Sequence, residues 1–329
     1  MWAFTKPIEL IRYLFVWRIN GPLVRLPRCL SAELSLVLGS AIADHLPTRQ
    51  ARPWRQALSP WDKYGGLAAL GKQKINRPPE APWPVETVLF PYPGKLVYGP
   101  GEMILWELKL LGESADHGFF LETILPAVEA VGSASDQQWR RLNKLWGRFE
   151  IHAVYAAHGP RWEPIVSAGR LDLSYRPTPD QWADGLPFDA ESKRVLDRLV
   201  WVTPFDFSDG AGGGRRKRKK RPPTLEDILE ALKLRMSLLL PGKHHTSDDV
   251  WDVLSAEDQA AFRSALELAA RIPVRRADLE PAPKRWPGRW IGTQTFPSIP
   301  GPLVPYLELA SILHVGRQTH LGCGTFRLE

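Results

Sequence analysis

Residues 311–328 read SILHVGRQTHLGCGTFRL, and three glycines interrupt this C-terminal stretch. Gly316, Gly322 and Gly324 surround a short basic and polar segment between a helix-like run over 303–314 and a strand-like ending over 325–328. Glycine permits positive φ and a close approach of another backbone, and consecutive N–H groups in such a turn suit a phosphate. The stretch therefore fits two interpretations, a loop that holds a polyanion and a plain glycine-rich helix end. Spacing alone favours the plain helix end.

The composition is that of a globular protein with an excess of positive charge. The chain has 329 residues, 44% hydrophobic and 24% charged, and this length predicts about two domains. A net charge of +7 and a pI near 9.4 favour an anionic partner such as nucleic acid. Cys29 and Cys323 are too few for a disulfide framework and lack a metal-type spacing, which favours a reducing cytoplasm and no zinc site.

Hydropathy predicts no association with a membrane. No stretch of the sequence approaches the roughly 20 consecutive apolar residues that a transmembrane helix needs. The N-terminal segment over 1–20 carries charges within its apolar part and has no small-residue cleavage site, so it does not read as a signal peptide. We therefore expect a cytoplasmic protein.

The first half of the chain alternates strand-like and helix-like segments. Strands are predicted over 12–19, 85–90, 103–111 and 148–156, and helices over 31–46, with Ser31 as N-cap, and over 119–131. Residues 48–84 are rich in Pro, Trp, Arg and Lys and show no clear period, so we interpret them as a long inserted loop. The resulting order, β-α-β-β-α-β, is that of a ferredoxin-like unit.

The second half repeats this order. Strands are predicted over 199–207, 274–279, 290–296 and 325–328, and helices over 224–240, 256–271 and 303–314. Thr224 is the expected N-cap of the first of these helices, and the helix over 256–271 is an addition to the repeated unit. We therefore predict an α+β fold of two tandem ferredoxin-like (RRM-like) domains, over 1–180 and 190–329.

A glycine-rich and strongly basic loop lies between the first strand and the first helix of the second half. It reads DGAGGGRRKRKKRPP over 209–223, and its consecutive glycines predict flexibility. The consecutive basic residues over 215–221 cannot pack together and must face solvent or a polyanion. We expect a solvated loop that contacts phosphates when nucleic acid is present, through Arg215, Arg216, Lys217 and Arg218.

The tandem order and the C-terminal stretch together resemble the RAMP superfamily of CRISPR-associated proteins. Most similar are the endoribonucleases that cut precursor CRISPR RNA within its repeats, the sixth CRISPR-associated protein. Their signature, His-x-Gly-(Lys/Arg)-x-Thr-x-x-Gly-x-Gly, is matched by His314, Gly316, Arg317, Thr319, Gly322 and Gly324. Residues 201–204 also resemble the strand ending in Thr-Pro that opens the family's second domain, and 223–239 resemble its first helix. The resemblance is good over 195–329 and rests mainly on the order of elements over 1–150.

This resemblance implies a metal-independent cleavage of RNA with no cofactor. A base removes the proton of the 2′-OH, the oxygen attacks the adjacent phosphate, and an acid protonates the leaving 5′ oxygen. The products are a 2′,3′-cyclic phosphate and a 5′-hydroxyl. The implied partners are CRISPR repeat RNA with a 3′ hairpin, and other subunits of a CRISPR effector complex in which the guide RNA is retained. The alternatives are a non-catalytic RAMP RNA-binding subunit and a general nucleic-acid-binding protein.

Two residues are candidates for catalysis. In the family the catalytic histidine lies in or just after the first helix, and His45 is the only histidine there. Histidine suits acid–base work because its unperturbed pKa is roughly 6.5. The alternative is structural, because His45 continues a stripe formed by Leu34, Leu38 and Ile42. Tyr13 is a second candidate, although a tyrosine on a strand is normally part of the core.

The residues that follow His45 are candidates for RNA binding. Arg49, Arg52 and Arg55 alternate with Trp54 and Trp61, and cations with aromatic rings are what RNA loops and ends require. The alternative is a Trp- and Pro-rich loop that packs on the domain. In the second half, Gly316, Arg317, Gly322 and Gly324 are expected to bind RNA through the glycine-rich loop.

Overall fold

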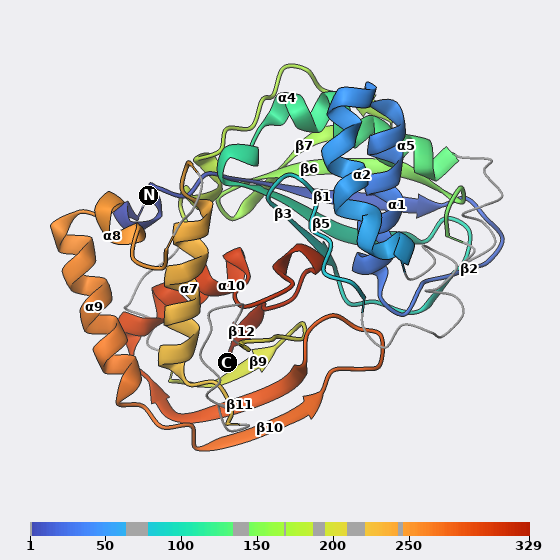
Figure 1. Ribbon diagram of the computed structural model, residues 1–329. Coiled ribbons are helices and arrows are strands. Elements are labelled where there is room, and N and C mark those ends of the chain that lie inside the picture. Colours follow the sequence, from blue (N-terminus) through green and yellow to red (C-terminus); the bar gives the residue numbers. More distant parts are fainter. Residues whose placement is uncertain are drawn as a thin grey trace. The chain divides into compact units, whose positions relative to one another are not determined.

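The computed structural model describes residues 2–63, 78–133, 145–167, 169–186, 195–208, 221–242 and 246–329. Contacts divide the chain into two compact units, each containing helices and a sheet (Figure 1). The N-terminal unit comprises 9–185 and 284–286, and the C-terminal unit comprises 1–8, 186–283 and 287–329. Within the described residues, no helix combines the length and the apolar character that crossing a bilayer requires.

The N-terminal unit is built on a six-stranded antiparallel sheet in the order β3-β5-β1-β6-β7-β8. The strands are β1 (Leu10–Ile19), β3 (Thr87–Pro91), β5 (Met103–Leu111), β6 (Phe149–His158), β7 (Arg161–Ser167) and β8 (Arg170–Leu171). A separate two-stranded pair joins β2 (Val24–Arg25) to β4 (Val97–Tyr98). The four strands of the predicted unit are β1, β3, β5 and β6 in chain order. The first of them, β1, lies between β5 and the last strand, β6, and β3 pairs with the other side of β5, which is the ferredoxin-like arrangement. The strand pair β7 and β8 extends this sheet beyond the predicted unit.

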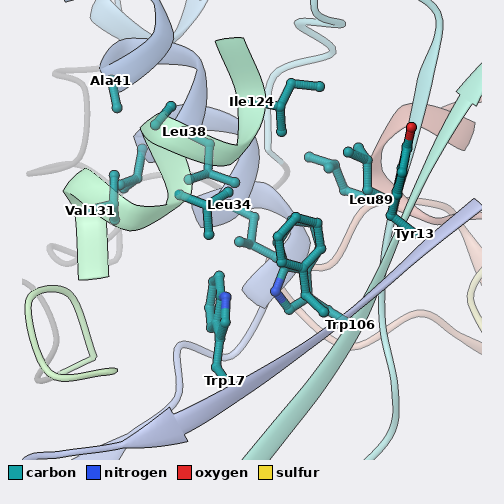
Figure 2. Close-up of a cluster of buried hydrophobic side chains, with 14 of the residues drawn as sticks. Tyr13, Trp17, Leu34, Leu38, Ala41, Leu89, Trp106, Ile124 and Val131 are labelled. Atoms are coloured by element: carbon teal, nitrogen blue, oxygen red, sulfur yellow. The ribbon is translucent and has the colours of Figure 1, made fainter. Parts of the chain in front are cut away.

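The helices of this unit cover one face of the sheet (Figure 1). They are α1 (Leu30–His45), α2 (Thr48–Lys63), α4 (His117–Phe119) and α5 (Leu125–Ser133), with a π-helical turn over Phe120–Ile124. Alternate residues of β1, among them Tyr13 and Trp17, point to the helices and are fully buried. Figure 2 shows Trp17 and Trp106 rising from the strands toward Leu34 and Leu38 of α1. Each such side chain stabilises the unit by about 1.5–3 kcal/mol.

Two local predictions for this unit are wrong. The first helix begins at Leu30 with Cys29 at its N-cap, so Ser31 does not cap it. Residues 48–63 of the predicted loop over 48–84 form α2. This helix buries Ala51, Trp54, Leu58 and Trp61, whose spacing of three or four residues is helical. Pro53 and Pro60 lie inside the helix, and the apolar stripe outweighs their local cost.

The C-terminal unit has a four-stranded sheet in the order β10-β11-β9-β12. Its strands are β9 (Leu196–Trp201), β10 (Arg276–Pro281), β11 (Trp290–Ile299) and β12 (Phe326–Leu328). Its helices are α7 (Leu225–Leu239), α8 (Val250–Val253), α9 (Ala256–Ala270) and α10 (Val304–Leu313). Thr224 is the N-cap of α7, as predicted, and it also forms a capping box with Asp227. Strand order and pairing match those of the N-terminal unit, so the predicted tandem ferredoxin-like α+β fold is confirmed.

Candidate nucleic-acid interface

The corner between α1 and α2 exposes His45. Pro47 follows at the turn, and Leu46 before it is extended because a residue preceding proline avoids the helical region. The ring Nδ1 of His45 lies 2.7 Å from the carbonyl oxygen of Ala41, four residues earlier. A carbonyl only accepts, so Nδ1 donates, and Nε2 of the neutral ring is left as the acceptor. The buried stripe of Leu34, Leu38 and Ile42 ends before His45, whose side chain faces solvent.

The solvent face of α2 carries a ridge of three arginines, Arg49, Arg52 and Arg55. All three are exposed, and none is in an ion pair with another residue that the structure describes. The ridge spans about 9 Å along the helix at roughly 1.5 Å per residue. Because α2 begins at Thr48, directly after the corner, His45 and the first arginine of the ridge, Arg49, are four residues apart in the chain and both are exposed. The positive charge of the ridge suits a polyanion beside a proton acceptor.

Packing against α1 fixes the orientation of this arginine ridge. Trp54 and Trp61 are 4% and 0% exposed, and both point inward from α2. Trp83 donates its indole N–H to the carbonyl oxygen of Ser35 at 3.0 Å. A side chain at Gly39 would come within 3.1 Å of that indole nitrogen and 3.2 Å of Leu58, so glycine permits the close approach. The prediction that RNA bases stack on Trp54 and Trp61 is therefore wrong. Both side chains instead pack on the domain, as the alternative interpretation of this segment expects.

Tyr13 is enclosed in the core of the N-terminal unit. Its ring stacks on Phe120 at a centroid distance of 3.7 Å, and its hydroxyl lies 3.0 Å from Nδ1 of His117. Burial raises the pKa of Tyr13, so its hydroxyl keeps its proton. Burial likewise lowers the pKa of His117, which favours the neutral ring. A fully buried hydroxyl cannot touch an RNA strand at the surface, so the geometry does not support the predicted catalytic role of Tyr13.

The glycine-rich segment after α10 is held mainly by its own backbone. His314 ends the helix at φ 59° and is buried. Its Nδ1 donates toward the carbonyl oxygens of Gly322 at 3.1 Å and Cys323 at 3.0 Å. Val315 and Gly324 are joined by an N–H···O bond of 3.0 Å, and Gly324 donates to the carbonyl oxygen of Pro204 at 3.0 Å. The segment is thus folded back on α10 and fastened to the residues after β9.

The three signature glycines serve this packing. Gly322 has φ 77° and ends a single 3-10 turn, and Gly324 has φ 85°. A Cβ on Gly324 would lie 1.9 Å from the carbonyl oxygen of Val315, and one on Gly316 would lie 2.8 Å from that of Asp206. Gly322 and Gly324 are buried, whereas Gly316 is exposed. RNA contact by the two buried glycines stays a prediction, and the surface of the segment is its tip around Gly316.

Arg317 is the exposed cation of this tip. Its N–H donates to the carbonyl oxygen of Asp206 at 2.9 Å, which ties the residue to the segment after β9. His320, three residues later, is buried, and burial lowers its pKa to about 3. Among the basic residues of 314–324, His314 and His320 are buried and Arg317 is exposed.

The basic loop lies almost entirely outside the described residues. This applies to Arg215, Arg216, Lys217 and Arg218, whose contact with phosphate stays a prediction. Arg221, at its end, is exposed and forms an ion pair with Asp227 at 3.0 Å. Nowhere in the described part of the chain do three His, Cys, Asp or Glu side chains gather as metal ligands would.

Comparisons with known proteins give structural neighbours alone. No family model and no curated protein matches the chain. Its neighbours among solved structures are Cas6 proteins. A Cas6 product complex is 17% identical with a TM-score of 0.48, covering 98% of this chain and 99% of that one. Thermus thermophilus Cas6 is 15% identical with a TM-score of 0.43 and the same coverage. A Cas6-RT-Cas1–Cas2 complex is 14% identical with a TM-score of 0.48, covering 98% of this chain and 29% of that one. At these sequence identities and TM-scores, the structural similarity to Cas6 proteins assigns no function to this chain.

Proposed function

We propose that this protein is an endoribonuclease that binds CRISPR repeat RNA and cleaves precursor CRISPR RNA without a metal ion. The observation that carries the proposal is the corner of α1 and α2. There an exposed imidazole with a fixed Nδ1 donor stands at the start of an arginine ridge. The match of 314–324 to the glycine-rich signature supports RNA as the substrate.

The proposed reaction needs one proton acceptor and nearby positive charge. Nε2 of His45 takes the proton of the 2′-OH, and the oxygen forms a bond to the adjacent phosphorus. Arginines of the ridge stabilise the charge that develops on the phosphorane. The bond from phosphorus to the 5′ oxygen then breaks, and that oxygen takes up a proton from water or the imidazolium. The products are a 2′,3′-cyclic phosphate and a 5′-hydroxyl.

RNA binding is proposed to use both units. The ridge of Arg49, Arg52 and Arg55 contacts phosphates near the cut, and Arg317 contacts phosphate from the tip of the glycine-rich segment. The cleaved RNA, with a 3′ hairpin, stays bound as a guide that other CRISPR effector subunits receive. Phosphate contacts of this kind make the affinity fall steeply with salt.

One observation favours a second candidate, a non-catalytic RAMP RNA-binding subunit. Tyr13 is buried, so it does not supply a second acid or base beside His45. Water would then have to protonate the leaving oxygen unless the imidazolium does so. A protein that binds RNA without cleaving it would need neither a general base nor a general acid.

Cleavage of repeat RNA in EDTA separates these candidates. Purified protein is incubated with labelled repeat RNA and, in parallel, with a scrambled RNA of the same composition. Cutting at one position of the repeat alone, with cyclic phosphate ends, supports the endoribonuclease. Tight binding of the repeat without cutting would instead support the RNA-binding subunit, and equal binding of both RNAs would contradict a CRISPR role.

A further inference from the structure

Gln318, next to Arg317, adopts an unusual backbone conformation. Its φ of 58° and ψ of 28° are left-handed, which non-glycine residues adopt at a cost in free energy. The carbonyl oxygen of Gln318 accepts the N–H of Leu321 at 3.0 Å. A left-handed glutamine in a glycine-rich segment indicates that its side chain has a task that glycine could not perform.

The side chain of Gln318 reaches the connection between β10 and β11. Its Oε1 accepts the N–H of Gly288 at 2.5 Å. Gly288 itself has φ 79°, and a Cβ there would lie 2.6 Å from the Cβ of Pro204. The next residue, Arg289, donates its N–H to the carbonyl oxygen of Phe205 at 2.9 Å. The turn at 288–289 is therefore fixed against the segment after β9.

Arg317 lies between two of these attachments. Its own N–H is bound to the carbonyl oxygen of Asp206, and the side chain of the following residue is bound to Gly288. Asp206 and Phe205 are neighbours in the chain, so the tip, the turn at 288–289 and the segment after β9 form one closed set of hydrogen bonds. Arg317, whose side chain is exposed, thus lies within this set of hydrogen bonds.

We propose that Gln318 is a positioning residue for RNA binding, which fixes Arg317 by tying the glycine-rich segment to the turn at 288–289. The inference rests on the proposed function, in which Arg317 contacts RNA. A cation on a backbone held at both sides loses less freedom on binding, and this preorganisation strengthens the complex. Without the hydrogen bond between Gln318 and Gly288, Arg317 keeps its charge, but its backbone is no longer held in one position.

The test measures the affinity of a labelled single-stranded repeat RNA across a salt series. Arg317→Ala is expected to weaken binding by about tenfold and to reduce the salt slope by about 1. Gln318→Ala is expected to weaken binding by about fivefold, with a reduced salt slope, because the fixed contact is lost. The double variant is expected to bind like Arg317→Ala alone, since Gln318 acts through Arg317.

Gln318→Gly keeps the test independent of folding. Glycine adopts the left-handed conformation without the cost that a side chain adds, and this gain offsets the loss of the hydrogen bond to Gly288, so its thermal midpoint is expected to lie close to that of the original protein. Its RNA affinity is nevertheless expected to fall as in Gln318→Ala. Original affinity in Gln318→Gly, or additive losses in the double variant, would overturn the positioning role while leaving RNA binding intact. No loss in Arg317→Ala would overturn both the tip's part in RNA binding and the role of Gln318.

Discussion

The two ferredoxin-like units share one topology but expose different kinds of residue. In the N-terminal unit, the connection between the first helix and the second strand displays His45 and the arginine ridge of α2 to solvent. In the C-terminal unit, the segment between the last helix and the last strand buries His314, Gly322 and Gly324. The signature glycines there build the loop, and Arg317, the proposed RNA contact, is exposed among them. The glycine motif therefore marks a packed loop of the C-terminal unit, whereas the proposed catalytic residue, His45, belongs to the N-terminal unit.

Substitution of Gly324 should give the largest effect on stability. Gly324→Ala places a Cβ 1.9 Å from the carbonyl oxygen of Val315, so the segment cannot close. We expect a loss of about 3–5 kcal/mol in the free energy of unfolding, measured by denaturant titration. Gly101 of the N-terminal unit has a similar φ of 81° with no atom within 4 Å of the added Cβ, so Gly101→Ala is the control. It should lose only about 1 kcal/mol. Equal losses in the two variants would contradict the packing role of Gly324.

Removal of the arginine ridge should act on binding rather than on folding. The triple substitution of Arg49, Arg52 and Arg55 by Ala is expected to weaken repeat RNA binding by about 10–100-fold and to flatten its salt dependence. Unfolding should change little, because all three side chains are exposed. Arg18→Ala is the control, since Arg18 is exposed but paired with Glu150. Unchanged affinity in the triple variant would remove α2 from the interface.

Acidification should destabilise the C-terminal unit through His320. Its folded pKa, about 3, lies below the usual value near 6.5, so the unfolded chain binds the proton first as pH falls. The contribution of the neutral ring is complete above about pH 6.5 and is lost between that pH and 3, at roughly 1 kcal/mol per pH unit. The free energy of unfolding measured at pH 7 and pH 5 should differ less in His320→Gln. The same difference in both proteins would show that His320 does not titrate as a buried group.

Tyr13→Phe should have the smallest effect, and it distinguishes a structural role of the Tyr13 hydroxyl from a catalytic one. The variant loses the hydrogen bond to His117 at 3.0 Å, so we expect a loss of about 1 kcal/mol in the free energy of unfolding. The cleavage rate on repeat RNA should stay within about twofold, because the hydroxyl is enclosed. A hundredfold slower cleavage with an intact fold would place Tyr13 at the reaction centre after all.

Local patterns were sufficient to predict the β-α-β-β-α-β order of both units but not the elements added to it, among them α2, β7 and β8. Partial alternation along β1, Thr224 as the N-cap of α7 and the apolar run before His314 placed these elements to within a few residues. Helix α2 was missed because prolines and arginines hid the regular spacing of its buried residues. The 3-4-3 spacing of Ala51, Trp54, Leu58 and Trp61 was the signal that would have found it.

The interior of the glycine-rich segment was beyond prediction from the sequence. Its partners lie far along the chain, as Gly324 bonds to Pro204 and Gln318 bonds to Gly288. Such pairs follow from the approach of two strands in the folded sheet and leave no local pattern. The burial of Tyr13, by contrast, follows from its place in the alternation of β1. The usual preference of a strand tyrosine for the core therefore holds for Tyr13.

The proposed function is tested most directly by the single-turnover cleavage rate of repeat RNA by His45→Ala in EDTA. We expect a rate roughly 10²–10⁴-fold below that of the original protein, with RNA affinity within about twofold. His158→Ala is the matched control, because His158 is a half-buried histidine of the same unit whose Nε2 lies 3.5 Å from a carboxylate oxygen of Asp184. It should cleave at the original rate. Undiminished cutting by His45→Ala would remove His45 from the mechanism and contradict the central claim.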